Sequence, residues 1–213
     1  MPRPQRPSLL RSFSSYTEKN KPRLYIALYP RGGDASSSLV SASGNCESYH
    51  WALIVGPQTA LRKDPGTRYH ITHTGSATSF ADARRLSAYT FQYEENDLLP
   101  ALNAQAILVR VAVAKVVDVA RVGQLLRDMP LPANDGSYSC LSWVRDAFAM
   151  LHNTRHTCLK SFQDADDWNN VYKCAMDFCK QKRAQRRVAE NEGTWNETNI
   201  STFNFWENRE TEP

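Results

Sequence analysis

The order of the strand-like and helix-like segments constrains the fold of this chain most strongly. Five segments are rich in β-branched and aromatic residues or alternate in polarity, and all of them precede the first helical pattern. They span residues 23–30, 49–55, 68–73, 87–95 and 105–116. Helical spacing of apolar residues follows over residues 118–129, 139–152 and 164–187. Strands followed by helices, rather than alternating with them, predict an α+β fold with mostly antiparallel strands.

The two ends of the chain differ from its middle in charge and polarity. Residues 1–23 carry a charge of about +5, and residues 188–213 carry about −5. Both ends lack strong periodicity, so we expect a disordered basic tail at 1–21, one α+β domain at 22–187 and a flexible acidic tail at 188–213. Because the two charges nearly cancel, the formal net charge of +4 does not support a nucleic-acid partner.

The targeting signals and the cysteines bear on the compartment. The chain has no run of 18 apolar residues, so we expect no membrane span, and its basic N-terminus lacks the apolar region of a secretory signal. Its 5 cysteines are an odd number at irregular spacings. Without a secretory signal this pattern favours reduced thiols and a cytoplasmic protein. The oligomeric state stays open.

The helix predicted at 139–152 begins with a cysteine. Most of its surface is apolar, so we expect it to be buried more completely than a surface helix. Cys140 lies in its first turn, where backbone N–H groups and the helix dipole stabilise a thiolate and can hold a developing oxyanion. Most helical cysteines serve only for packing. A nucleophilic cysteine also needs a base within hydrogen-bond reach.

Two histidines on neighbouring strands are candidates for that base and its partner. Segments 49–55 and 68–73 predict a hairpin, in which paired residue numbers have a constant sum of 120–124. An even sum places His50 and His70 on one face of the sheet, whereas an odd sum places His73 on the face of His50 instead. In a cysteine–histidine pair one ring takes the thiol proton and a third group fixes its tautomer. The pattern therefore favours Cys140 as nucleophile, His50 as base and His70 as the orienting group.

A metal site is the alternative use of the same side chains. Cys46, His50, His70 and Cys140 are ligand types that bind Zn²⁺ tetrahedrally. None of these residues has the short paired spacing of a zinc motif, and Cys46 lies in a loop rich in Ser and Gly. We therefore expect neither a metal nor another cofactor.

Three phrases carry a resemblance to a known group of enzymes: "YHWALIVGP" (49–57), "RYHITH" (68–73) and "SCLSWVRDAF" (139–148). Their order resembles the circularly permuted papain-like group that includes lecithin:retinol acyltransferase. The resemblance implies an antiparallel sheet packed against a buried helix that begins with the nucleophile, with His50, His70 and Cys140 as base, orienting residue and nucleophile. Ser139 replaces the Asn of that group. Residues 22–180 also resemble fungal proteins grouped as a family of unknown function.

The expected function follows from this site. We expect a cysteine-dependent acyl-transfer enzyme, either a hydrolase or an acyltransferase, that forms a thioester with a small-molecule or peptide acyl substrate. The sequence leaves hydrolysis, acyl transfer and amide formation open, because all share the first half-reaction. A non-catalytic binding module on a papain-like scaffold is the alternative. The basic stretch 180–187 favours a solvated helix end over a nucleic-acid site.

Overall fold

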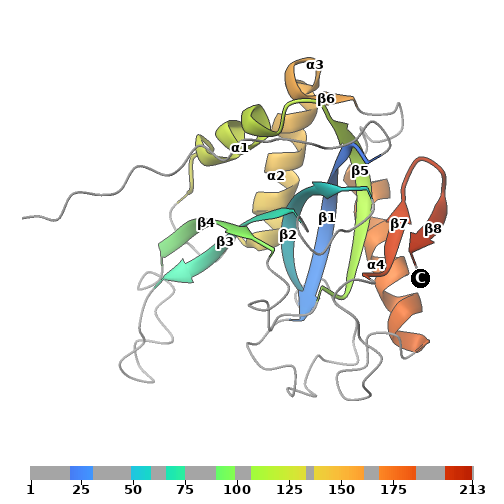
Figure 1. Ribbon diagram of the computed structural model, residues 1–213. Helices are drawn as coiled ribbons and strands as arrows, with labels where there is room; N and C mark the ends of the chain where they lie inside the picture. Colours follow the sequence, from blue (N-terminus) through green and yellow to red (C-terminus); the bar gives the residue numbers. More distant parts are fainter. Residues whose placement is uncertain are drawn as a thin grey trace, which may run out of the picture.

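One sheet organises the part of the chain that the structure describes. The computed structural model describes residues 20–30, 49–58, 66–74, 90–98, 107–132, 137–160, 168–185 and 200–212. Its 8 strands run in the order β4-β3-β2-β1-β5-β7-β8, with the short β6 beside β5 (Figure 1). The strands are β1 (Pro22–Pro30), β2 (Tyr49–Pro57), β3 (Thr67–Thr74), β4 (Thr90–Asp97), β5 (Val109–Val116), β6 (Leu159–Lys160), β7 (Thr202–Asn204) and β8 (Arg209–Glu212). Only the β5–β7 pairing is parallel among these strands, so the α+β prediction is confirmed.

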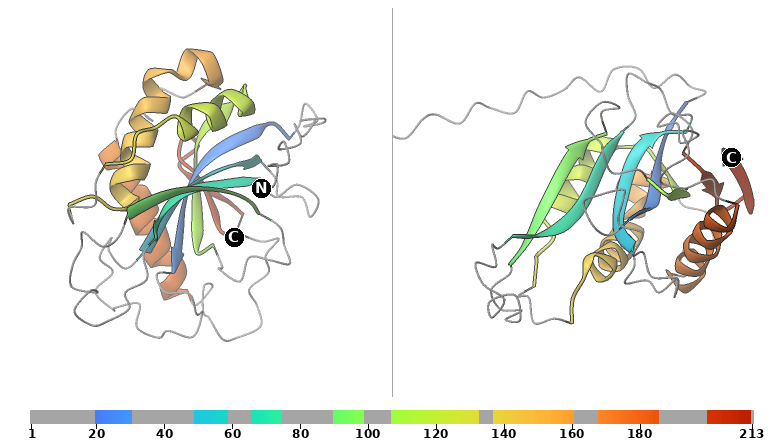
Figure 2. Two further views of the ribbon diagram at one scale, coloured as in Figure 1. Left: turned by 90° about the vertical axis from the view of Figure 1, so that its left-hand side faces the viewer. Right: turned by 90° about the horizontal axis from the view of Figure 1, so that it is seen from below.

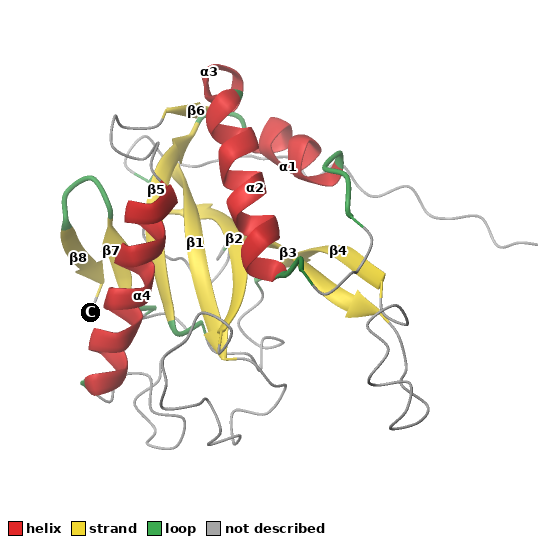
Figure 3. Cartoon of the chain, turned by 180° about the vertical axis from the view of Figure 1, so that it is seen from behind, coloured by secondary structure: helices red, strands yellow, loops and turns green. Residues whose placement is uncertain are grey.

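The long helices gather on one face of this sheet. The helices are α1 (Val119–Arg127), α2 (Cys140–Asn153), α3 (Arg155–Cys158) and α4 (Trp168–Ala184). Helix α2 contacts β2 and β3, whereas α4 contacts β5 and β1. Figures 2 and 3 show α2 and α4 on the same side of the strands, and α1 contacts α2 and α3. No helix in the described residues is long and apolar enough to cross a membrane.

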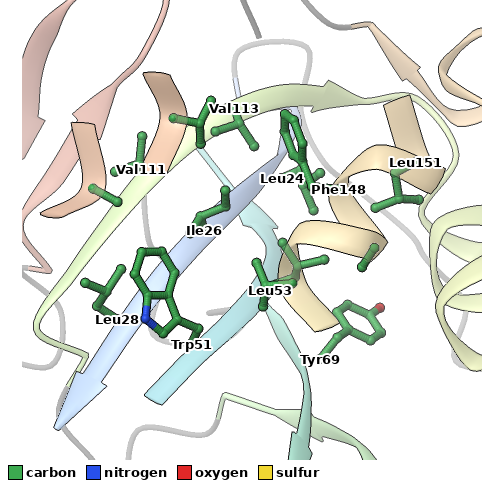
Figure 4. Close-up of a cluster of buried hydrophobic side chains, with 14 of the residues drawn as sticks. Leu24, Ile26, Leu28, Trp51, Leu53, Tyr69, Val111, Val113, Phe148 and Leu151 are labelled. Atoms are coloured by element: carbon green, nitrogen blue, oxygen red, sulfur yellow. The ribbon is translucent and has the colours of Figure 1, made fainter. Parts of the chain in front are cut away.

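The core lies between the central strands and these helices. Leu24, Ile26 and Leu28 of β1 belong to the cluster that faces α2 and α4 (Figure 4). The alternate residues Tyr25 and Tyr29 belong to a second buried cluster on the opposite face. Every residue of β1 is buried, which explains why its sequence does not alternate between apolar and polar residues.

The sheet opens between β2 and β3. Their ladder pairs Leu53–Val55 with Thr67–Tyr69 and does not continue toward the start of β2. Strand β3 instead pairs along its whole length with β4, from Thr67–Asp97 to Thr74–Thr90. The β3–β4 ribbon therefore projects away from the rest of the sheet (Figure 1). This opening lies beside the start of α2.

The C-terminal prediction was wrong for residues 200–212. These residues form β7 and β8, and β7 pairs in parallel with β5. Phe203 and Trp206 pack against the buried clusters, and the buried Lys182 of α4 forms an ion pair with Glu210. The segment mixes three glutamates and other polar residues with the four apolar residues that pack in the clusters, Ile200, Phe203, Phe205 and Trp206, so the sequence gives no strong strand signal. Residues 1–19 and 186–199, and with them the other tail predictions, lie outside the described part.

Candidate active site

Strands β2 and β3 bring His50 and His70 together. The observed pairing of Leu53 with Tyr69 gives a sum of 122, which is even and within the predicted range. His50 and His70 therefore share a face as diagonal neighbours. His50 Nε2 lies 2.8 Å from His70 Nδ1, and the two rings meet edge to face with centroids 4.9 Å apart. The geometric prediction for this pair is confirmed; the side chain of His73, the alternative, lies outside the described residues.

Cys140 reaches the same corner of the molecule from α2. The helix begins at this residue, and the Ser139 hydroxyl caps it by accepting the N–H of Ser142. The backbone N–H of Trp51 donates to Cys140 Sγ over 3.5 Å, and Trp51 directly follows His50. The β2–β3 ladder has ended before this point, and Figure 3 shows the start of α2 near the place where the two strands separate. Residues 89 positions apart thus meet.

The sulfur lies beside two sources of partial positive charge. Cys140 is 8% exposed and occupies the first turn of a 14-residue helix. The dipole of this helix and the N–H of Trp51 both place partial positive charge beside Sγ. Nucleophilic attack by a thiolate on a carbonyl carbon is the chemistry that such an environment supports.

His70 is a neutral ring. Burial, the nearby Arg68 guanidinium and His50 together lower its pKa to about 3, and the Glu94 carboxylate only partly opposes them. The ring is 3% exposed. Because His70 is uncharged near neutral pH, its 3.5 Å contact with Glu94 joins a dipole to a charge rather than two ions. A neutral His70 can orient His50 without adding a positive charge beside it.

Three polar side chains around His70 were missed by the sequence analysis. Glu94 lies opposite His70 in the β3–β4 ladder, and Asn96 Nδ2 lies 3.3 Å from His70 Nε2. The Thr72 hydroxyl donates to Glu94 Oε1 over 2.7 Å. The alternation of "FQYEEND" is the signal that places Glu94 and Asn96 on one face, but only the register with β3 connects them to His70.

Burial opposes ionisation of the other described cysteines. Burial raises the pKa of the Cys158 thiol, and it raises the pKa of Cys174 and of Cys179 to about 11. These thiols are therefore protonated and unreactive near neutral pH. All four are free cysteines, and Cys46 lies outside the described residues.

Aromatic side chains flank the site on both sides. The Trp51 ring stacks on Tyr172 of α4, with centroids 5.5 Å apart. On the other side Tyr138 meets Phe91 of β4 at 5.6 Å. The Tyr138 hydroxyl donates to Asp146, so it already has an acceptor and is a poor candidate for an oxyanion donor.

Metal ligands do not gather here in the described part of the chain. No group of three or more His, Cys, Asp or Glu side chains in that part is arranged to hold an ion. The neutral His70 bonds His50 instead. The Zn²⁺ alternative also required Cys46, which lies outside the described residues.

Comparisons with known proteins place the chain in one family. No curated protein and no solved structure matches it. The model of a family described as "Family of unknown function (DUF6914)" matches residues 21–212, which is nearly the whole chain. The match includes β7 and β8, so the C-terminal strands belong to the family's domain. The chain belongs to this family of unknown function, DUF6914.

Proposed function

We propose that the protein is a cysteine-dependent acyl-transfer enzyme with a permuted papain-like arrangement of its catalytic residues. Cys140 is the nucleophile, His50 is the base and His70 orients His50. One observation carries the proposal: the Cys140 sulfur accepts the N–H of Trp51, while the preceding His50 contacts His70 at 2.8 Å. A helix-terminal sulfur at Trp51 and an oriented imidazole at the preceding residue of β2 are the two groups that nucleophilic cysteine catalysis needs.

The reaction proceeds in two halves. The Cys140 thiol gives its proton to His50, and the sulfur attacks the carbonyl carbon of an amide, peptide or ester. The bond to the leaving amine or alcohol breaks, and that group takes the proton from His50, which leaves a thioester on Cys140. Water or an amine then attacks the thioester and gives a proton to His50. The sulfur departs and recovers this proton.

The backbone at the start of α2 stabilises the charge that develops on the carbonyl oxygen. The Cys140 N–H is the donor best placed for this role, because it belongs to the first turn of the helix. The acceptor decides the outcome: water gives hydrolysis, whereas an amine or alcohol gives acyl transfer. A reducing, cytoplasmic compartment would keep the thiol available for either reaction.

Thiol reactivity tests the proposal without knowledge of the substrate. We expect iodoacetamide at pH 6 to label Cys140 much faster than Cys158, Cys174 or Cys179, whose raised pKa keeps them protonated. Peptide mass spectrometry identifies the labelled cysteine. p-Nitrophenyl acetate should give a burst of p-nitrophenolate equal to the enzyme concentration, with the acetyl group on Cys140.

Matched variants make this experiment specific. Cys140→Ala should abolish the burst, whereas Cys174→Ala, which removes a partly buried thiol on α4, should leave it unchanged. His50→Ala should slow both labelling and burst, because the base is lost. Slow, equal labelling of all thiols would refute the enzyme and favour a non-catalytic binding module on the same scaffold.

A further inference from the structure

We propose that Glu94 is a positioning residue: its carboxylate holds the proton of His70 on Nε2 and thereby determines which nitrogen of His50 faces the cysteine. The catalytic consequence of this inference rests on the function proposed above. Its structural content, the protonation site of His70, does not depend on that function and is measured separately.

The Glu94 carboxylate is held in a single orientation. The Thr72 hydroxyl donates to Oε1 over 2.7 Å, and Asn96 Nδ2 donates to Oε2 over 3.2 Å. These hydrogen bonds, with that of Thr72 the largest cause, also lower the pKa of Glu94, so the carboxylate is ionised near neutral pH. Its Oε2 lies 3.5 Å from His70 Nε2. A fixed negative charge therefore faces one nitrogen of a buried ring.

This charge selects one tautomer of His70. A neutral imidazole carries one proton, on either Nδ1 or Nε2. A proton on Nε2, 3.5 Å from the carboxylate oxygen, would be attracted by the negative charge, whereas a lone pair there would face a like charge. Asn96 Nδ2, 3.3 Å from Nε2, is the opposing donor. Its amide also bonds Glu94 Oε2, and a charged acceptor outweighs a neutral donor.

The tautomer of His70 determines the tautomer of His50. With its proton on Nε2, His70 presents the lone pair of Nδ1 to His50 Nε2, 2.8 Å away. His50 must then donate from Nε2, so its own lone pair is on Nδ1. Nδ1 is the ring nitrogen that does not contact His70, and in the proposed mechanism it takes the thiol proton of Cys140. Glu94, His70 and His50 thus form a directional chain: a charge–dipole contact with Glu94 orients the proton of His70, and a hydrogen bond passes that orientation on to His50.

Removal of the Glu94 carboxylate should favour the opposite tautomers of His70 and His50. The charged groups that act on His70 are Arg68 of β3, His50 of β2 and Glu94 of β4, and only Glu94 attracts a ring proton. Without it, Asn96 remains as a donor to Nε2, which favours the proton on Nδ1. His70 would then donate to His50 Nε2 and the His50 proton would move to Nδ1, where it blocks proton transfer from the thiol.

Nitrogen NMR tests the structural step directly. The ¹⁵N chemical shift separates a protonated from an unprotonated imidazole nitrogen. With ¹⁵N-histidine in the full chain at pH 7, we expect His70 to be protonated on Nε2, and Glu94→Ala to move the proton to Nδ1. A proton on Nδ1 in the unaltered protein overturns the proposal, and so does an unchanged tautomer in Glu94→Ala. If Glu94→Ala does not fold, the protonation site of His70 in the unaltered protein is by itself the test.

Alkylation of Cys140 tests the catalytic step. Glu94→Ala should slow iodoacetamide labelling at pH 7 by at least about tenfold, because a wrong tautomer removes the base. The matched control is Glu95→Ala: this neighbour on β4 bonds Arg127 at 2.7 Å and should leave the rate unchanged within about twofold. Equal slowing in both variants overturns the positioning role. An unreactive Cys140 in the unaltered protein refutes only the proposed enzyme, since the tautomer measurement stands by itself.

Discussion

Strands β1 and β4 belong to one sheet but are built in opposite ways. All 9 residues of β1 are buried, whereas none of the 8 residues of β4 is fully buried. Strand β1 lies between two partners and two apolar clusters. Strand β4 forms the edge of the sheet and carries charged side chains at Glu94, Glu95 and Asp97. The central strands thus form the scaffold, and the β3–β4 ribbon contributes the polar side chains around His70.

The candidate site lies where these two regions meet. His50 belongs to β2 of the scaffold, whereas His70 belongs to the ribbon and is bonded by side chains of the edge strand. A carboxylate such as Glu94 stays ionised on an edge strand because water reaches it and because two hydrogen bonds satisfy it. The comparison therefore predicts that substitutions in the two regions affect stability and chemistry to different degrees.

The largest loss of stability is expected for a substitution in the scaffold. Ile26 of β1 is 0% exposed and lies in the main cluster (Figure 4). Ile26→Ala removes buried methyl groups and leaves a cavity, so it should lower the free energy of unfolding by about 2–5 kcal/mol. The control Gln92→Ala, at an exposed position of β4, should change it by less than about 0.5 kcal/mol. Urea denaturation measures both; similar losses would contradict the division into scaffold and ribbon.

An intermediate effect is expected at the junction between the two regions. Gly66, directly before β3, has φ +109°, and an added Cβ would lie 2.5 Å from the Val55 carbonyl oxygen. The backbone conformation and the close approach both require glycine. Gly66→Ala should therefore cost about 1–3 kcal/mol of stability, and it should loosen the ribbon that carries His70.

Gly123 provides a control for which the expected change in stability has the opposite sign. Gly123 lies inside α1, where an added Cβ would meet only the far ends of the Arg127 and Tyr69 side chains, at 3.4 and 3.5 Å. Gly123→Ala should stabilise the protein by up to about 1 kcal/mol, because alanine favours the helix. A loss of stability in Gly123→Ala equal to that in Gly66→Ala would show that lack of space, not the junction geometry, dominates.

The scaffold was easier to predict from the sequence than the surroundings of the site. The apolar runs that became β1, β2, β5 and α2 are strong local signals, and the even register of one hairpin was enough to pair His50 with His70. Strand β7 was not predicted, because its few apolar residues lie among glutamates and its partner β5 is about 90 residues away. Glu94 was not predicted either, because a polar edge strand gives no burial signal and its register depends on tertiary contacts.

The smallest effect is a dependence of stability on pH that arises from His70. Its pKa is about 3 in the folded protein and about 6.5 in the unfolded chain. Between these values the unfolded chain takes up a proton that the folded protein does not, so acid favours unfolding. The penalty is small above pH 6.5 and grows as the pH falls toward 3. From pH 7 to pH 5.5 it should remove about 1 kcal/mol of the free energy of unfolding.

His70→Asn isolates this contribution. The variant keeps a hydrogen-bonding side chain and all other histidines, so the two proteins should differ in their loss of stability between pH 7 and pH 5.5 by about 1 kcal/mol. Glu94 remains ionised throughout this interval, since its hydrogen bonds lower its pKa. Urea denaturation at the two pH values measures the difference. Identical losses in the two proteins would mean that His70 titrates normally, and that it is not the buried neutral ring that orients His50.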